Sequence, residues 1–363
     1  MKFLSRERLK SIPLFTIDKF NSLSWDKNSR LIIKGDGSNW VLSSIAKEMM
    51  DVCNNLNIKT VNSRYLYNCN NQCVFFTSKY EVLMNWSKPK HRVAFPYYHG
   101  NPRSNVKFKK MIDNIKNHHN DISRIQVSHT AMEDLILNTG INQNKIHKIP
   151  ISINLDFFQF ATKSKVIELR QELKIPTSAM VIGSFQKDGV GWGEGMEPKL
   201  IKGPDIFLKA LEVLKRDIPE IFVLLTGPSR GFVKKGLERL KIQYKHINLK
   251  DYSAIGRYYS VLDLYLVTSR EEGGPRAVLE SFACGVPLVT TRVGQAIDMV
   301  NHEENGWIVD IDDYEGLAYW SKYALENKNN IGNILLNARN LAEDNCYKSQ
   351  LSLWHYFMQG YVD

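Results

Sequence analysis

The stretch SREEGGPRAVLESFACGVPLVTT occupies residues 269–291. The apolar run DLYLV ends one residue before it, and the apolar run PLVTT closes it. Between these runs lie a polar turn with two glycines and an amphipathic segment that begins near Pro275. A strand, a turn, a helix and a second strand in this order are typical of a parallel sheet covered by helices. The stretch therefore predicts an α/β fold.

The same alternation runs through nearly the whole chain. Short runs rich in β-branched and aromatic residues predict strands at 31–34, 60–62, 73–77, 93–96, 125–128, 146–149, 180–185, 221–226, 262–267 and 287–290. Longer stretches with helical spacing predict helices over 41–56, 105–117, 131–138, 163–173, 204–215, 231–240, 253–261, 275–284 and 314–326. The aromatic segment 347–361 predicts a further packed helix.

The length of 363 residues indicates two domains, each large enough to bury a core. We expect a Rossmann-like domain over 1–160, a second over 161–345 and a terminal helix over 346–363 that packs back toward the first. Two doubly wound domains of this kind would face each other across a cleft, because open α/β sheets bind ligands outside the carboxyl ends of their strands.

Composition indicates the cellular compartment in which the protein is expected. Apolar residues make up 43% of the chain, and the five cysteines have neither disulfide nor zinc spacing. The N-terminal stretch lacks the apolar region of a signal peptide, and no run is long enough to span a bilayer. We therefore expect a cytoplasmic protein, free or peripherally attached to the inner face of a membrane.

Positive charge is concentrated in the first part of the chain. Residues 1–150 hold 23 Lys and Arg against 11 Asp and Glu, although the whole chain has a net charge of +10. Anionic lipid headgroups, a phosphorylated substrate or nucleic acid would suit such a surface, and a merely solvated basic face remains the alternative. Since the sequence has no nucleic-acid recognition motif, we do not expect a nucleic-acid partner.

The turn at 274–277 has the features of an anion site. Proline suits the first position of a helix, so Gly274, Pro275 and Arg276 would lie at a helix N-terminus on the carboxyl edge of a sheet. Unpaired backbone N–H groups and the helix dipole favour a phosphate there, and Arg276 would add a charge-assisted contact.

Two carboxylates, Glu272 and Glu280, flank this turn. Carboxylates accept hydrogen bonds from neighbouring sugar hydroxyls, so the pair could hold both ends of a nucleotide sugar whose diphosphate lies on the helix. The alternative is that Glu272 only favours the helix N-terminus electrostatically and that Glu280 is a surface helix residue.

Other glycine-rich turns follow predicted strands. The loop after residues 180–185 carries Lys187 and Lys202, two point charges suited to a diphosphate. In the first half, GDGSNW at 35–40 contains Gly37, and His99 follows another strand. The remaining histidines have no metal-ligand spacing, so no metal site is expected.

Taken together, these motifs resemble a known family. The run from Glu272 to Glu280, followed by SFACGVPLVTTRVGQAIDMV and ENGWIVD, resembles the E-x7-E signature of retaining glycosyltransferases of group 1 (family 4-like) with the GT-B fold. The resemblance extends upstream through KGPDIFLKAL and more loosely into QVSHTAMEDLILNTGINQNKIHKIPISINLDFF.

The resemblance implies roles for the donor-site residues. Glu272 would contact hydroxyls of the donor sugar, Glu280 the ribose, and Lys202 and the turn at Gly274 the diphosphate. Two residues of the first half would also belong to the site. His99 would contact the donor sugar, and Gly37 would approach the diphosphate and the acceptor.

One position departs from the family pattern. The family usually has an arginine directly after the glycine of the strand at 180–185, where this chain has Ser184. Lys187 would then supply the missing cation.

The expected reaction is transfer of a sugar from a nucleotide-diphosphate sugar to a hydroxyl acceptor, with retention and without a cofactor or a metal. The acceptor would be a lipid-linked compound or a saccharide, in bacterial-type polysaccharide, lipopolysaccharide or glycolipid synthesis. A nucleotide-sugar epimerase of the same fold and a glycoside hydrolase, which also uses paired carboxylates, remain as alternatives.

Overall fold

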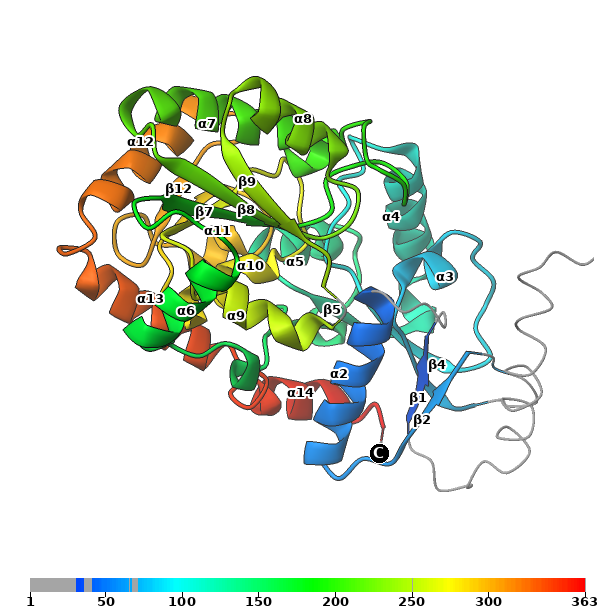
Figure 1. The fold of residues 1–363 in the computed structure, drawn as a ribbon. Helices are drawn as coiled ribbons and strands as arrows, with labels where there is room; N and C mark the ends of the chain where they lie inside the picture. Colours follow the sequence, from blue (N-terminus) through cyan, green and yellow to red (C-terminus); the bar gives the residue numbers. More distant parts are fainter. Residues whose placement is uncertain (1–30, 36–40, 65, 67–70, 250, 363) are drawn as a thin grey trace, which may run out of the picture. The chain divides into compact units, whose positions relative to one another are not determined.

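The computed structural model describes residues 31–35, 41–64, 66, 71–249 and 251–362 of the chain. These residues form two compact units (Figure 1). Unit 1 comprises the described residues of Met1–Ile149 together with those of Leu351–Asp363, and unit 2 is Pro150–Gln350.

Unit 1 contains a six-stranded parallel sheet in the order β2-β1-β3-β4-β5-β6. Its strands are β1 (Leu31–Lys34), β2 (Thr60–Ser63), β3 (Cys73–Phe76), β4 (Arg92–Pro96), β5 (Ile122–Val127) and β6 (Ile146–Lys148). β1, β3 and β4 are apolar and buried on both faces, as expected of strands with helices on either side.

Helices cover both faces of this sheet. They are α2 (Val41–Asn55), α3 (Lys79–Leu83), α4 (Val106–His118), η1 (His119–Asp121), α5 (Thr130–Leu137), η2 (Gln143–Lys145) and α14 (Leu351–Met358). The buried side chains of α2 and α14 share one core cluster, and those of α3, α4 and α5 share the other.

The terminal helix α14 belongs to the core of unit 1. Trp354 and Phe357 are buried and pack edge to face on Phe75 of β3, with ring centroids 6.4 and 6.1 Å away. Tyr361 is also buried, and its backbone carbonyl accepts a hydrogen bond from the Cys73 thiol. The end of the chain therefore completes the hydrophobic layer over β1 and β3.

Unit 2 contains a second six-stranded parallel sheet in the order β12-β11-β10-β7-β8-β9. Its strands are β7 (Met180–Phe185), β8 (Ile221–Thr226), β9 (Gln243–Ile247), β10 (Leu264–Val267), β11 (Leu288–Thr291) and β12 (Trp307–Val309). Every residue of β8, β10 and β11 is buried, which matches their continuous apolar sequences.

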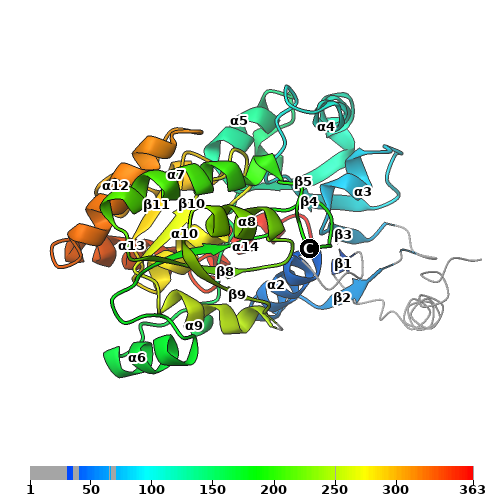
Figure 2. The ribbon, with the colours of Figure 1, turned by 45° about the horizontal axis from the view of Figure 1, so that its top comes forward.

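The helical segments of unit 2 also form two layers. They are η3 (Leu155–Phe157), α6 (Lys163–Glu172), η4 (Leu200–Lys202), α7 (Pro204–Asp217), α8 (Gly231–Arg239), η5 (Tyr252–Ile255), α9 (Gly256–Tyr259), α10 (Arg276–Ala283), α11 (Ala296–Met299), α12 (Tyr314–Glu326) and α13 (Gly332–Asp344). α7, α8 and α12 cover one face of the sheet, and α6, α9, α10 and α13 cover the other (Figures 1 and 2). The segment after Pro150 packs in the second layer, where Ile153 and Phe158 are buried.

These two helix-covered parallel sheets confirm the predicted fold class of two doubly wound α/β units. The sequence prediction missed the edge strands β9 and β12, the helices α3, α11 and α13, and the short turns η1 to η4. The sequence of β9, QYKHI, is largely polar because its side chains are exposed or half-buried, and β12 has only three residues. The expected helix over 253–261 is shorter and divided between η5 and α9.

The position of Pro275 differs by one residue from the prediction. Pro275 is the N-cap of α10, with an extended backbone (φ −64°, ψ 105°), and the helix begins at Arg276. The amides left unpaired at the start of this helix therefore begin at Arg276.

In the part of the chain that the structure describes, no helix combines the length and the apolar composition needed to cross a bilayer.

We predict that replacing Phe357 by Ala destabilises unit 1 by about 3–5 kcal/mol, because the cavity would open within the layer over β3. A urea titration followed by circular dichroism measures the loss. The matched control is Leu353→Ala on the same helix, where the side chain is 42% exposed and the expected change is within about 0.5 kcal/mol. Equal losses in the two variants would contradict the packing described for α14.

Candidate functional site

Two loops of unit 2 are joined at the carboxyl edge of the sheet. One contains η4 and lies after β7, and the other, residues 268–272, follows β10. The backbone N–H of Arg270 donates to the carbonyl of Ile201 at 2.8 Å, and the Arg270 guanidinium binds the Asp205 carboxylate through two contacts of 2.8 and 2.7 Å. These bonds hold the loops in one fixed arrangement.

Gly203 makes this junction possible. Its backbone is left-handed, with φ +62°, and a Cβ there would lie 1.8 Å from the carbonyl oxygen of Thr268. The Thr268 hydroxyl instead donates to the Gly203 carbonyl at 2.9 Å. Only glycine combines this backbone with so close an approach, so the Lys-Gly pair at 202–203 brings Lys202 to the second loop.

Lys202 and Glu272 form the centre of the site. Lys202 Nζ lies 2.6 Å from Glu272 Oε1, and the Ser269 hydroxyl donates to the same oxygen at 2.8 Å. The two charged side chains are only 23% and 13% exposed. The structure therefore brings together the predicted sugar-binding carboxylate and the predicted diphosphate-binding lysine.

The start of α10 follows this pair directly along the chain. Among the described residues, no side chain caps the helix. Gly274 is closely packed, since a Cβ there would lie 2.6 Å from Gln295 Oε1, which accepts a hydrogen bond from the Ile151 amide. The helix N-terminus is thus a fixed group of amide donors beside Glu272 and Lys202.

Glu280 lies deeper, on the second turn of α10. The Tyr259 hydroxyl donates to its Oε2 at 2.7 Å, and the Tyr252 hydroxyl donates to its Oε1. Burial raises the pKa of Glu280 above its usual 4.5, although both hydroxyls and the Arg276 guanidinium oppose this shift. Glu280 is therefore a buried, hydrogen-bonded carboxylate and not a surface helix residue.

Ser184 is buried and faces the protein interior. Its hydroxyl and its carbonyl accept hydrogen bonds from the Arg230 guanidinium at 3.0 and 2.6 Å. Arg230 is itself fully buried, with Nε 2.9 Å from the Asp188 carboxylate. Arg230 thus joins the end of β7 to the loop that follows it.

That loop, residues 186–199, is a hairpin packed on the start of α8. The amides of Gly231 and Phe232 donate to the carbonyls of Glu194 and Gly195 at 2.7 and 2.9 Å. Lys187 Nζ lies 3.9 Å from the centroid of the Trp192 ring, over an indole that is 66% exposed.

Lys199 also belongs to this cluster. Burial and the positive charges of Lys202 and Lys187 lower the pKa of Lys199, and the charge of Glu272 opposes the shift. Three ammonium groups and one carboxylate therefore interact at the carboxyl edge of the sheet.

His99 lies in unit 1, after the carboxyl end of β4. Its ring packs edge to face on Phe108 with centroids 5.6 Å apart, and its backbone carbonyl accepts a hydrogen bond from Lys79. Lys79 is only 4% exposed, with its ammonium 3.8 Å from the centroid of the Tyr97 ring. The other predicted residue of this half, Gly37, lies outside the described residues.

Sequence reasoning missed several residues of the site. Tyr252 and Tyr259 contact Glu280 from 28 and 21 residues away, so no local spacing signals them. Lys199 and Arg230 depend in the same way on long-range packing. Ser269 is the exception, because a hydroxyl three residues before Glu272 in the same turn was available as a local signal.

Within the described part of the chain, no three His, Cys, Asp or Glu side chains are grouped so that they could hold a metal ion.

Comparisons with known proteins agree with this geometry. Residues 197–341 match the model of the family "Glycosyl transferases group 1". The D-inositol 3-phosphate glycosyltransferase of Xylanimonas cellulosilytica is 28% identical over 193 residues, which are 49% of this chain and 42% of that protein. The lipopolysaccharide core biosynthesis mannosyltransferase LpsB of Rhizobium meliloti is 31% identical over 132 residues, or 32% of this chain and 36% of LpsB. The chain thus spans less than half the length of these curated relatives.

Solved structures extend the likeness of fold to both units. Anabaena Alr3699/HepE in complex with UDP superposes with a TM-score of 0.67 at 14% identity, covering 91% of this chain and 97% of that one. A glycosyltransferase from Rickettsia africae gives a TM-score of 0.64 at 17% identity, covering 92% and 98%. The chain therefore has the GT-B fold, and its residues 197–341 match the family model of the glycosyl transferases of group 1.

Proposed function

We propose that this protein is a retaining glycosyltransferase that moves a sugar from a nucleotide-diphosphate sugar to a hydroxyl acceptor. The observation that carries the proposal is the contact between Lys202 and Glu272 beside the start of α10. It places a cation, a hydroxyl-binding carboxylate and a row of amide donors next to one another.

The charges of this cluster suit a diphosphate. Lys187, Lys199 and Lys202 bring three positive charges near the Glu272 carboxylate. A diphosphate would be attracted by these ammonium groups, and its negative charge increases as the bond to the sugar breaks. Fixed ammonium groups and helix amides would stabilise that developing charge without a metal ion.

The two carboxylates would hold the groups on either side of the diphosphate. Glu272 is partly exposed and would accept from hydroxyls of the donor sugar. Glu280 already accepts from two tyrosine hydroxyls, but a carboxylate has about four acceptor positions, so two remain for the ribose hydroxyls. Tyr252 and Tyr259 would then fix the direction of that carboxylate.

The transfer itself would proceed with retention at the anomeric carbon. The acceptor oxygen would form its bond to that carbon on the face from which the diphosphate leaves, while the bond between the carbon and the phosphate oxygen breaks. The acceptor proton would pass to a phosphate oxygen of the leaving group. The contact of His99 with the donor sugar stays a prediction from the family resemblance.

The solved relatives favour a uridine nucleotide, because Anabaena Alr3699/HepE has been solved with UDP and with UDP-glucose. We propose a lipid-linked or saccharide acceptor, in bacterial-type polysaccharide, lipopolysaccharide or glycolipid synthesis at the cytoplasmic face of a membrane. The curated relatives support this acceptor class, since one acts in lipopolysaccharide core biosynthesis.

The proposal predicts that at least one of a set of UDP-, GDP- and ADP-sugars raises the melting temperature, because a ligand that binds only the folded state stabilises it. With that donor, Lys202→Ala should lower kcat/KM for transfer about 100-fold or more, as expected for a lost transition-state cation. Proton NMR of the product should show the anomeric configuration of the donor.

The control for this experiment is Lys235→Ala, which removes an exposed lysine of α8 and should leave transfer unchanged. Undiminished transfer in Lys202→Ala would refute the site, and an inverted product would refute the mechanism.

Glu280→Gln tests the buried carboxylate through pH. The folded-state pKa of Glu280 is raised, so its ionisation weakens the fold as pH rises above about 4.5, whereas Gln stays neutral. The stability of the variant relative to the wild type should therefore increase as pH rises above about 4.5, while its affinity for the nucleotide falls. Melting temperatures at several pH values measure this. Parallel pH profiles for the two proteins would contradict the burial of Glu280.

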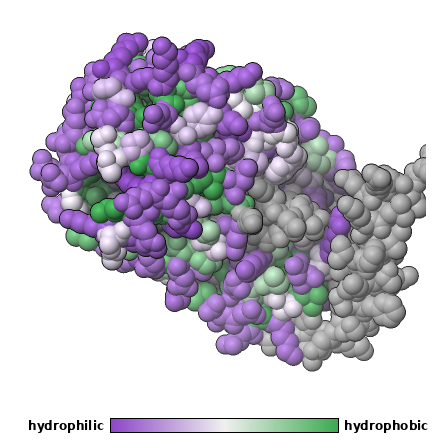
Figure 3. All heavy atoms as spheres, viewed as in Figure 1, coloured by the Kyte–Doolittle hydropathy of each residue, from purple (hydrophilic) through white to green (hydrophobic). Residues whose placement is uncertain are grey.

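The positive charge of residues 1–150 supports peripheral attachment to anionic lipid, with about 1 kcal/mol for each basic residue near the surface. Hydrophobic side chains are scattered among hydrophilic ones on the face drawn in Figure 3.

We therefore predict co-sedimentation with phosphatidylglycerol vesicles at low salt, which added salt should reverse because it screens the attraction. Phosphatidylcholine vesicles are the control. If no protein pellets with the anionic vesicles, the attachment is refuted.

A further inference from the structure

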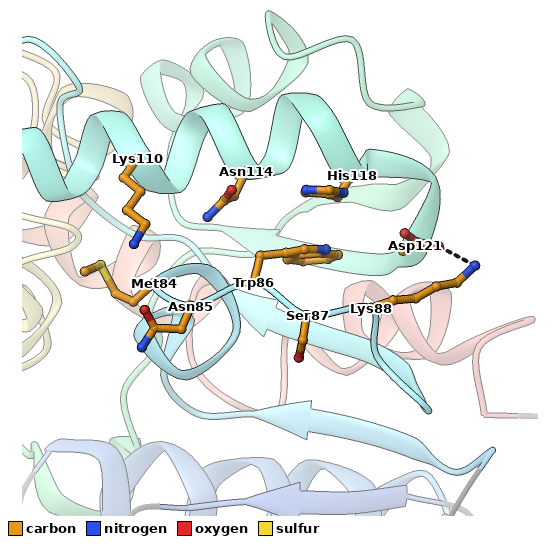
Figure 4. A pocket seen from close by; sticks show the side chains of 9 residues that line it. All are labelled: Met84, Asn85, Trp86, Ser87, Lys88, Lys110, Asn114, His118 and Asp121. Atoms are coloured by element: carbon orange, nitrogen blue, oxygen red, sulfur yellow. Dashed lines mark ion pairs between the residues drawn. The ribbon is translucent and has the colours of Figure 1, made fainter.

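Unit 1 has an open hollow of about 770 Å³ between α4 and the loop that follows α3. Lys110, Asn114 and His118 project into it from α4, and Trp86 projects from the loop (Figure 4). The three α4 residues are spaced four apart, so they lie on one face of the helix.

A parallel aromatic pair forms one side of the hollow. The rings of Trp86 and His118 are stacked with centroids 4.8 Å apart and an interplanar angle of 7°. The Asn114 side chain donates to the Leu83 carbonyl at 2.8 Å and fastens the end of α3, where the loop begins, to α4. The indole is therefore held in place and lines the hollow as a fixed surface (Figure 4).

Polar side chains line the rest of the hollow. Asn85 and Ser87 offer hydrogen-bond donors and acceptors, and the Asp121 carboxylate lies 3.8 Å from Lys88 Nζ. An aromatic pair with amide, hydroxyl and carboxylate groups along the same hollow suits a sugar, which has apolar C–H faces and many hydroxyls. A wholly apolar ligand would leave these polar groups unsatisfied.

The charge around the hollow indicates the type of sugar. α4 exposes four lysines against one acidic residue, Asp113. Lys110 and Lys88 line the hollow itself, and Asp121 offsets only one of them. An acidic sugar would balance this excess of positive charge.

We propose that this hollow is a saccharide-binding site of its own, which takes an acidic sugar residue of a glycan chain between the Trp86–His118 pair and Lys110. The site is separate from the carboxyl edge of the sheet. The loop after α3 leads into the start of β4, and α4 with η1 leads into the start of β5. The hollow therefore lies at the opposite edge from Gly35, Thr77 and His99, which follow strand ends.

The role of this site in sugar transfer rests on the proposed function. The binding of a saccharide at the hollow does not. A glycan chain held at the hollow would stay near the enzyme and raise the effective concentration of its growing end. Binding at the hollow and binding of the nucleotide sugar can be measured separately, so failure of one is distinguishable from failure of the other.

The experiment uses the full chain labelled with ¹⁵N and two oligosaccharides of equal length, an oligogalacturonate and a neutral maltooligosaccharide. Trp86→Phe assigns the indole N–H signal of Trp86. Titration with oligogalacturonate should shift that signal, and the maltooligosaccharide should bind about tenfold more weakly because it lacks the charges. Added salt should weaken only the acidic ligand.

Variants localise the binding. Trp86→Ala should abolish the binding of oligogalacturonate, and Lys110→Ala should weaken it about tenfold. Lys116→Ala, which removes an exposed lysine of α4 outside the hollow, should have no effect. Binding of the nucleotide sugar should stay unchanged in all three variants.

Several results would overturn the proposal. One is the absence of a Trp86 shift with oligogalacturonate, and another is equal weakening by Lys110→Ala and Lys116→Ala. A shift caused by phosphatidylglycerol vesicles but not by oligogalacturonate would show a lipid contact instead. If Trp86→Ala unfolds, Lys110→Ala and the directly observed indole signal still decide the question.

Discussion

The ion pair between Lys202 and Glu272 is the contact on which the proposed donor site depends. Both charges are largely shielded from water, so each needs the other as a partner. Their meeting requires Gly203, whose missing Cβ allows the loop after β7 to reach the carbonyl of Thr268. The ion pair between Arg270 and Asp205 also fastens these two loops. The close approach of Gly203 to Thr268 thus sets the geometry of the two loops. It also brings the charges of Lys202 and Glu272 together just before α10 begins.

The surroundings of Ser184 explain how the site obtains its positive charge. The Arg230 guanidinium occupies the space beside Ser184 and bonds to its hydroxyl and carbonyl. A second arginine at position 184 would therefore meet a buried like charge. The hairpin at 186–199 instead brings Lys187 and Lys199 to the edge of the sheet, and the ion pair of Arg230 with Asp188 anchors that hairpin. These two cations therefore come from the loop after β7 and not from the strand itself.

Much of the fold could be predicted because parallel strands buried on both faces have continuous apolar sequences, as in IFVLLT and LYLV. The edge strand QYKHI has no such signal, since its polar side chains reach solvent. In the site, the spacing from Glu272 to Glu280 and the Lys-Gly pair are local patterns and could be found. The tyrosines on Glu280, the buried Arg230 and the stacked rings of Trp86 and His118 depend on contacts between distant segments, which no local pattern encodes.

The central claim is that the start of α10 and Lys202 hold a diphosphate. A crystal structure of the protein with the nucleotide sugar that stabilises it tests this most directly. We expect the diphosphate oxygens within hydrogen-bond distance of the amides from Arg276 onward and of Lys202 Nζ, with the ribose hydroxyls on Glu280. A nucleotide bound elsewhere, with these donors uncontacted, would contradict the account.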